Sequence, residues 1–301
     1  MITSLLLLLA SSIVFAQEHP DGFKISTDVE LVLLDVSVKG RQGNYRSGLG
    51  RDSFRVYENG EPQTISEFAS GDVPVVAGLV MDDSGSMRSK RPETILAGLA
   101  FIEASNPQDQ IFVVNFNENA RRGLPTSVPF SDDINLLRSA LAIGRPEGRT
   151  ALYDAIALAL KHLESGRHDR KALVVVSDGG DNISEHTFKE VATLIQESRA
   201  TIYTVGIFDA DDSDRNPDVL KHIADLSGGE RFLPNSLDQI VPICQKIAKD
   251  IRNRYTIGYV PVRRDNKSAL RKIRVVTVAP DGEKLIVRTR ASYVMPNRVT
   301  K

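Results

Sequence analysis

The chain has 301 residues, of which 41% are hydrophobic and 26% are charged, and this length and composition exclude disordered and fibrous proteins. The 38 Lys and Arg residues nearly balance the 39 Asp and Glu residues, Trp is absent and 6% of residues are aromatic, so neither overall charge nor a stacking platform predicts nucleic-acid binding. Cys244 is the single cysteine, which excludes an internal disulfide and a multi-cysteine zinc site.

Residues 1–16 are predicted to be a signal peptide. The apolar run from Ile2 to Phe15 is shorter than the roughly 20 residues of a typical membrane-spanning helix. Val14 and Ala16 place small residues at positions −3 and −1 of a cleavage site, so the mature chain would begin at Gln17. No Lys or Arg precedes the run, and a short buried or membrane-tethered segment is the alternative. We expect an exported protein, periplasmic or extracellular, with no integral membrane segment in the mature chain.

Residues 17–72 are predicted to be a β segment. Between Lys24 and Phe68, short runs of alternating apolar residues are separated by glycines, which is typical of strands and turns. Asn59 and Gly60 lie between two such runs and favour a tight hairpin.

The next segment, residues 73–252, is predicted to form an α/β unit. Continuous apolar runs, which indicate strands buried on both faces, alternate with segments of helical pattern. The expected strands cover residues 75–81, 110–116, 172–177 and 201–208, and the expected helices cover residues 91–104, 134–142, 152–163, 188–198 and 237–252. This order predicts a doubly wound, mostly parallel sheet flanked by helices, as in Rossmann-like folds. Cys244 lies on the apolar face of the last helix and is expected to be a core residue.

Residues 253–295 return to a β pattern, and residues 296–301 form a short tail. Strand patterns cover residues 255–262, 272–278 and 284–294, with a Pro-Asp-Gly turn before the last of them. Neither this segment nor the N-terminal β segment is long enough to bury a core alone. We therefore expect the two to pair into one small β-sandwich.

Polar side chains lie at the carboxyl ends of the expected parallel strands. Asp82, Ser84 and Ser86 follow the first expected strand, Thr150 precedes the third expected helix, and Asp178 follows the third expected strand. Open α/β sheets bind ligands at this edge. Carboxylates and hydroxyls without His or Cys are the ligands of a hard divalent cation. Mg²⁺ is the expected ion, and Mn²⁺ and Ca²⁺ are alternatives that the same oxygens would serve.

These residues resemble the metal-ion-dependent adhesion site of von Willebrand factor A (VWA) domains, which begins with the string Asp-x-Ser-x-Ser. The resemblance covers about residues 73–251, and residues 148–155 and 177–182 fit the second and third loops of the family's site. It implies that Ser84, Ser86 and Thr150 contact the metal through their hydroxyls and that Asp82 and Asp178 hold it directly or through water. It also implies that a protein or peptide partner supplies a Glu or Asp carboxylate to the open coordination position.

The sequences that flank this unit resemble the exported VWA-related proteins of acidobacteria. The similar segments are residues 54–60 before the unit and residues 255–259 and 288–290 after it. Because those proteins are largely without an assigned role, this narrower resemblance implies an architecture and not an activity.

Three further groups of polar residues are weaker candidates. Asp83 is the second residue of the Asp-x-Ser string and is expected to point outward, with a structural or solvated role and a functional role both left open. Asp181 and Asn182 either support the third loop or cap the start of a helix, and the two readings are equally good. The acidic run at residues 209–214 lacks the Gly and Glu of an EF-hand, so we expect a solvated loop.

These patterns favour a binding protein over an enzyme. The chain has no Gly-x-Ser-x-Gly elbow, its five histidines have no His-Glu-x-x-His spacing, and the His and Ser motifs of subtilisin-like proteases are missing. We expect no catalytic activity and a protein that captures a partner carboxylate through a cation. The alternative is a structural or assembly component with a vestigial metal site, in which the edges of the β-sandwich make the contacts.

Overall fold

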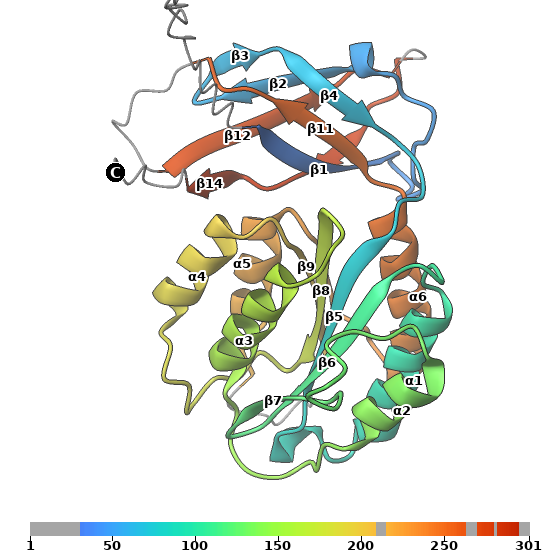
Figure 1. Cartoon of the computed structure of the whole chain (residues 1–301), viewed down its shortest axis with the longest axis vertical. Helices are drawn as coiled ribbons and strands as arrows, with labels where there is room; N and C mark the ends of the chain where they lie inside the picture. The colour runs from blue at the N-terminus through green and yellow to red at the C-terminus, as the bar shows by residue number, and fades with distance from the viewer. Residues whose placement is uncertain (1–30, 209–214, 263–269, 280–281, 295–301) are drawn as a thin grey trace, which may run out of the picture.

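The computed structural model describes residues 31–208, 215–262, 270–279 and 282–294. The predicted signal peptide at residues 1–16, the acidic run at residues 209–214 and the tail at residues 296–301 lie outside these ranges. Two parts are stacked along the long axis of the molecule, a β-sandwich and an α/β unit (Figure 1).

The α/β unit is built on one six-stranded sheet with the order β10-β9-β8-β5-β6-β7. Its strands are β5 Val75–Asp82, β6 Gln110–Phe116, β7 Ala120–Arg122, β8 Arg170–Ser177, β9 Thr201–Gly206 and β10 Arg231–Phe232. The strands pair in parallel except β7, which pairs antiparallel with β6. All eight residues of β5 are buried, because helices cover both faces of the sheet. The predicted doubly wound, mostly parallel sheet is thus confirmed.

Six helices flank this sheet in the described part of the chain: α1 Arg91–Glu103, α2 Ile134–Ala142, α3 Leu152–Glu164, α4 Phe188–Glu197, α5 Pro217–Ser227 and α6 Ile240–Arg252. Figure 1 shows α3, α4 and α5 together on one side of the sheet and α1, α2 and α6 together on the other. Helix α5 was not predicted, although its ends carry ordinary signals. Asn216 caps its first turn through Val219 N, Pro217 opens it, and Gly228 ends it with φ 77°.

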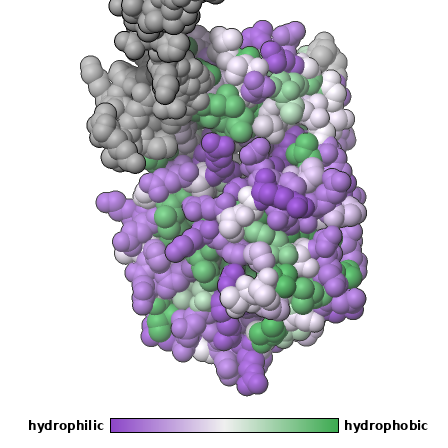
Figure 2. All heavy atoms as spheres, in the orientation of Figure 1, coloured by the Kyte–Doolittle hydropathy of each residue, from purple (hydrophilic) through white to green (hydrophobic). Residues whose placement is uncertain are grey.

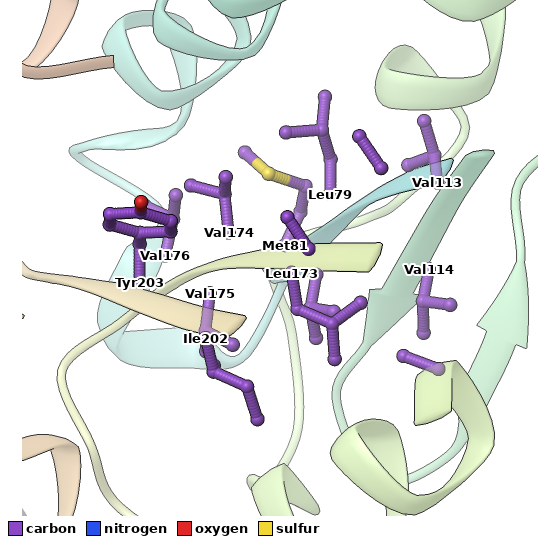
Figure 3. Packing of buried hydrophobic residues seen from close by; sticks show 14 of the residues in the cluster. Leu79, Met81, Val113, Val114, Leu173, Val174, Val175, Val176, Ile202 and Tyr203 are labelled. Carbon is purple, nitrogen blue, oxygen red and sulfur yellow. The ribbon is translucent and has the colours of Figure 1, made fainter. Parts of the chain in front are cut away.

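Side chains of the central strands fill the core on both faces of the sheet. In Figure 3, Val174 and Val176 of β8 point to one face and Val175 points to the other, as the two-residue period of a strand requires. Gly78 of β5 makes room for this packing, because a Cβ there would overlap the ring of Phe112 and the side chain of Leu173. Cys244 is 1% exposed and packs in the same cluster, so the prediction of a core residue is confirmed.

The β-sandwich combines strands from both ends of the chain. One sheet has the order β13-β1-β11-β4 and the other has the order β14-β12-β2-β3. Their strands are β1 Val32–Lys39, β2 Phe54–Glu58, β3 Glu61–Gln63, β4 Ile65–Ala69, β11 Tyr255–Tyr259, β12 Leu270–Thr277, β13 Ile286–Arg288 and β14 Ser292–Val294. Each sheet pairs N-terminal with C-terminal strands, as expected from the size of the two segments. Asn59 and Gly60 both have positive φ in the predicted β2–β3 hairpin.

The β-sandwich lies against the amino ends of the parallel strands (Figure 1), and buried polar groups fix this junction. Asp250 of α6 accepts hydrogen bonds from Ser37 Oγ at 2.8 Å and Tyr203 OH at 2.6 Å. Arg254 donates through Nε to Tyr203 OH at 2.9 Å, and Lys39 Nζ lies 3.7 Å from Asp250 Oδ1. The carboxyl ends of the parallel strands, where the candidate ligands lie, therefore face away from the β-sandwich.

The face of the molecule seen in Figure 2 is mainly polar. Figure 2 shows hydrophilic residues over most of the visible face, with apolar residues in small groups between them. Within the described ranges, no helix is both long enough and apolar enough to cross a membrane.

Candidate metal centre

The first candidate ligand, Asp82, is the last residue of β5 and is 2% exposed. Its Oδ1 accepts a hydrogen bond from Ser84 N at 2.9 Å, and its Oδ2 accepts one from Ser177 Oγ at 2.6 Å. The first bond folds the chain back directly after the strand, and the second fixes the carboxylate against the end of β8. Asp82 is thus held at the carboxyl edge of the sheet by two neighbouring strands.

Ser84, Ser86 and Asp178 form a chain of hydrogen bonds at the same edge. Ser84 Oγ lies 3.1 Å from Ser86 Oγ, and Ser86 Oγ donates to Asp178 Oδ2 at 2.5 Å. Asp178 follows β8, and its Oδ1 accepts from Gly180 N at 3.0 Å. The structure therefore brings together two carboxylates and two hydroxyls that come from sequence positions about 90 residues apart.

Thr150 reaches this edge on a second loop. Gly85 N donates to Gly148 O at 3.1 Å, which joins this loop to the turn that carries the two serines. Thr150 N donates to Asn182 Oδ1 at 3.0 Å, and Asn182 N donates to Thr150 O at 3.0 Å, which joins it to the third loop. Among the described residues the Thr150 hydroxyl makes no hydrogen bond to the other four candidates. The loops are thus in contact, but Thr150 is not part of the hydrogen-bond chain.

The electrostatics of the site fit a cation. Burial, and then the nearby charge of Asp178, raise the pKa of Asp82 to about 7, against the opposing effect of its hydrogen bonds from Ser177 and Ser84. No Lys, Arg or His of the described ranges lies within ion-pair distance of Asp82. Two carboxylates and three hydroxyls are a suitable donor set for Mg²⁺, which usually retains several waters and binds few carboxylates. Elsewhere, too, the described residues hold no group of three or more His, Cys, Asp or Glu side chains placed to bind a metal.

The expectation for Asp83 was wrong. Its side chain is 0% exposed and forms an ion pair with Arg91 Nη1 at the start of α1. The hydrogen bonds of the Asp83 backbone explain why its side chain points inward. Asp83 N donates to Phe116 O at 2.7 Å and Asp83 O accepts from Glu147 N at 3.0 Å, so the residue continues the sheet edge instead of turning outward. Its partner comes from another element, and no local pattern in the sequence indicates this contact.

Asp181 and Asn182 take both of the roles that the sequence left open. Asn182 holds Thr150, as described above. Asp181 Oδ1 accepts hydrogen bonds from Ser184 Oγ at 2.5 Å and from Tyr153 N, in the first turn of α3, at 3.2 Å. These residues therefore support the third loop and also cap the start of a helix on the second.

The α/β unit is similar to known proteins in sequence and in fold. Residues 78–180 match the family model described as von Willebrand factor type A domain. A von Willebrand factor type A protein from Catenulispora acidiphila has a TM-score of 0.53 and 17% identity, and the match covers 88% of this chain and 74% of that one. The von Willebrand factor domain of the type V pili tip protein Mfa5 from Porphyromonas gingivalis has a TM-score of 0.50 and 15% identity, over 60% of this chain and 97% of that one.

A relative by sequence comes from a cyanobacterium. The uncharacterized protein sll0103 of Synechocystis sp. is 26% identical over 168 residues, which are 52% of this chain. The chain spans 37% of the length of that relative. The family model runs from Gly78 within β5 to Gly180 in the third loop and includes the five candidate ligands, and the solved structures share the fold around them. Residues 78–180 therefore match the von Willebrand factor type A family, and the α/β unit around them has the fold of such domains.

Proposed function

We propose that this protein binds a protein or peptide partner through a divalent cation held by Asp82, Ser84, Ser86, Thr150 and Asp178. The observation that carries the proposal is the meeting of two carboxylates and two serine hydroxyls at one sheet edge, with no cationic side chain of the described residues paired with Asp82. Mg²⁺ fits this donor set, and Mn²⁺ or Ca²⁺ could be held by the same oxygens. When bound, the cation would supply positive charge that attracts a Glu or Asp carboxylate of the partner.

The protein's own residues have distinct tasks in this proposal. Ser177 and Ser84 N hold the Asp82 carboxylate in place, and Gly180 N holds that of Asp178. The surrounding loops would select the partner by shape and charge. A VWA domain suggests an adhesion or protein-interaction role, and the type V pili tip protein Mfa5 contains such a domain. We propose binding and no catalysis, since the chain carries no nucleophile motif.

We also propose that the protein acts outside the cytoplasm after cleavage near Ala16. The apolar run with small residues before Gln17 supports this proposal. The resemblance of the flanking segments to exported proteins of acidobacteria supports it too. Pulse labelling followed by N-terminal sequencing of the secreted chain tests it. A mature protein that begins at Gln17 is expected, and a chain that keeps Met1 in the cytoplasm would contradict it.

The cation site is tested by thermal unfolding of the mature protein, first in EDTA and then with Mg²⁺, Mn²⁺ or Ca²⁺. A cation that binds only the folded protein stabilises it by about 2.7 kcal/mol at 100 times its dissociation constant, so the melting temperature should rise. The Asp82→Ala variant should show no rise. An unchanged melting temperature of the wild-type protein at saturating metal would contradict the proposal and favour a vestigial site, with contacts made by the β-sandwich.

A further inference from the structure

Asp83 and Arg91 form a buried ion pair directly beside the candidate metal centre. The Asp83 side chain is 0% exposed and that of Arg91 is 10% exposed. Arg91 Nη1 pairs with Asp83 Oδ1, and neither carboxylate oxygen accepts a hydrogen bond from the described residues. Arg91 Nη2 donates to Leu141 O, in the last turn of α2, at 2.9 Å. Arg91 thus connects Asp83 with the end of α2, which leads into the loop that carries Thr150.

The loop that carries Thr150 is shaped around this pair. It begins at Gly144, where a Cβ would overlap the Asp83 carboxylate, so the chain passes directly over the buried acid. Three residues later, Glu147 N donates to Asp83 O at 3.0 Å. The loop of residues 143–150 therefore packs against the Asp83 side chain at Gly144 and is hydrogen-bonded to the Asp83 backbone at Glu147. The neighbouring Ser84–Ser86 turn is fixed to the same loop through Gly85 N and Gly148 O.

We propose that the Asp83–Arg91 pair is a positioning device for the metal centre. It holds the loop of Thr150 against the turn of Ser84 and Ser86, so the cation affinity depends on two residues that contact no cation. The inference rests on the proposed function and adds a determinant of affinity to it. Residues that orient metal ligands commonly change metal affinity by about 10–100-fold when they are replaced.

A purely structural role for the pair makes a different prediction. Replacing a buried ion pair by apolar or neutral side chains is often neutral for stability, whereas removing one partner leaves an uncompensated charge and destabilises the fold. The double variant Asp83→Asn/Arg91→Met carries no unpaired charge, so it should fold even where the single variants do not. If the pair only stabilises the fold, this double variant binds the cation normally. If the pair positions the loop, the double variant is folded and binds weakly.

The β-sandwich offers a matched control. Glu58 and Arg271 form a buried pair there, with side chains 3% and 5% exposed and a distance of 3.5 Å between Arg271 Nη1 and Glu58 Oε1. This pair is in the part of the molecule that lies at the other edge of the sheet from the metal centre (Figure 1). The double variant Glu58→Gln/Arg271→Met removes the same kind of interaction without touching the loops of the site.

The experiment measures Mn²⁺ binding to the mature protein by electron paramagnetic resonance, at a temperature where circular dichroism shows each variant to be folded. The Asp83→Asn/Arg91→Met variant should bind Mn²⁺ about 10–100-fold more weakly than the wild-type protein. The Glu58→Gln/Arg271→Met variant should bind it unchanged. Arg91→Lys keeps the charge but cannot contact Asp83 and Leu141 O together, so its affinity should lie between these values.

Two outcomes separate the inference from the proposed function. If the wild-type protein binds Mn²⁺ and Asp82→Ala does not, while Asp83→Asn/Arg91→Met binds like the wild-type protein, the positioning role is wrong and the metal site stands. If the wild-type protein itself binds no Mn²⁺, the proposed function fails and the inference fails with it. Should the double variant not fold, a normal affinity of Arg91→Lys and of Gly144→Ala would likewise overturn the positioning role.

Discussion

The amino ends and the carboxyl ends of the parallel strands form two opposite edges of the central sheet. Both edges contain buried acids, but these acids have different charged neighbours. At the amino edge, Asp250 is 1% exposed and has Arg254 and Lys39 as cationic neighbours. At the carboxyl edge, Asp82 is 2% exposed and its charged neighbour is another acid, Asp178. Burial alone would raise the pKa of both groups. Burial is the largest single effect on Asp250, but Arg254, Lys39 and the hydrogen bonds from Tyr203 and Ser37 together outweigh it and lower the pKa of Asp250. At the other edge, Asp178 adds to burial and raises the pKa of Asp82.

This difference distinguishes the structural junction at the amino edge from the proposed binding site at the carboxyl edge. A buried acid with its own cations in the protein is neutralised in the folded state and needs no ligand. Two buried acids that lie close together repel each other when both are ionised, and a cation bound between them would relieve the repulsion. The amino edge therefore fastens the β-sandwich to the α/β unit, and the carboxyl edge carries the proposed cation site.

Loss of Arg254 should have the largest effect on stability. Arg254→Met leaves Asp250 buried without its closest arginine and should lower the free energy of unfolding by about 3–5 kcal/mol, measured by urea denaturation in EDTA. Asp82→Asn is the matched variant at the other edge. Because Asn keeps an acceptor for Ser84 N and removes the repulsion with Asp178, its stability should equal or exceed that of the wild-type protein. If both variants lost the same amount of unfolding free energy, the charged groups at both edges would have a structural role.

The second-largest expected effect is a loss of stability on acidification, which comes from the ion pairs of Asp250 at the amino edge. The pKa of Asp250 is lowered in the folded protein, so the stability it contributes is present above the unfolded-state value of about 3.9 and is lost as the pH falls through the lower folded-state value. The difference in unfolding free energy between the wild-type protein and Asp250→Asn should therefore be largest near neutral pH and shrink below about pH 4. Urea denaturation at a series of pH values measures this difference.

An exposed acid provides the control for the pH experiment. Asp225 is 45% exposed and forms an ion pair with Lys221 at 2.5 Å on the surface of α5. Asp225→Asn should change stability by less than about 1 kcal/mol at any pH, since exposed pairs contribute little. If the difference in unfolding free energy between the wild-type protein and Asp250→Asn instead stayed constant on acidification, that result would contradict the stabilising role assigned to the charge of Asp250.

The sequence predicted the carboxyl edge better than the amino edge, for a physical reason. Asp82, Ser84 and Ser86 stand in one short string after a buried strand, and the ends of parallel strands necessarily meet, so Asp178 could be placed beside them. The amino edge is assembled from Ser37, Tyr203 and Asp250, which are far apart in the chain and belong to three different elements. No periodicity or motif within one segment indicates such a contact.

Asp83 shows the same limit inside the site itself. Its position in the string was visible, but its direction depends on Gly144 and Arg91, which reach it only after the sheet and helices have packed. The fold class and the pairing of the terminal β segments could be predicted because they follow from hydrophobic patterns and from segment size. Helix α5 was missed although Asn216, Pro217 and Gly228 mark its ends, so its absence from the prediction reflects signals that were present and not used.

The smallest expected effect concerns the hydrogen bonds between the second and third loops of the metal centre. Asn182→Ala removes the acceptor of Thr150 N but leaves every candidate ligand in place. Because one such hydrogen bond contributes about 1 kcal/mol, the affinity for Mn²⁺ should fall about fivefold. Isothermal titration calorimetry on the mature protein measures this change.

Thr187 supplies the control, because it is a polar residue of the segment that follows the same loop. Its side chain accepts a hydrogen bond from Glu190 N at 3.3 Å in the capping box of α4. Thr187→Ala should lower the stability by about 1 kcal/mol and leave the Mn²⁺ affinity unchanged. If Asn182→Ala instead behaves like Thr187→Ala, losing stability and keeping its affinity, then the loop contacts at the carboxyl edge serve the fold alone. The contrast between the two edges would then rest on their charges and not on their hydrogen bonds.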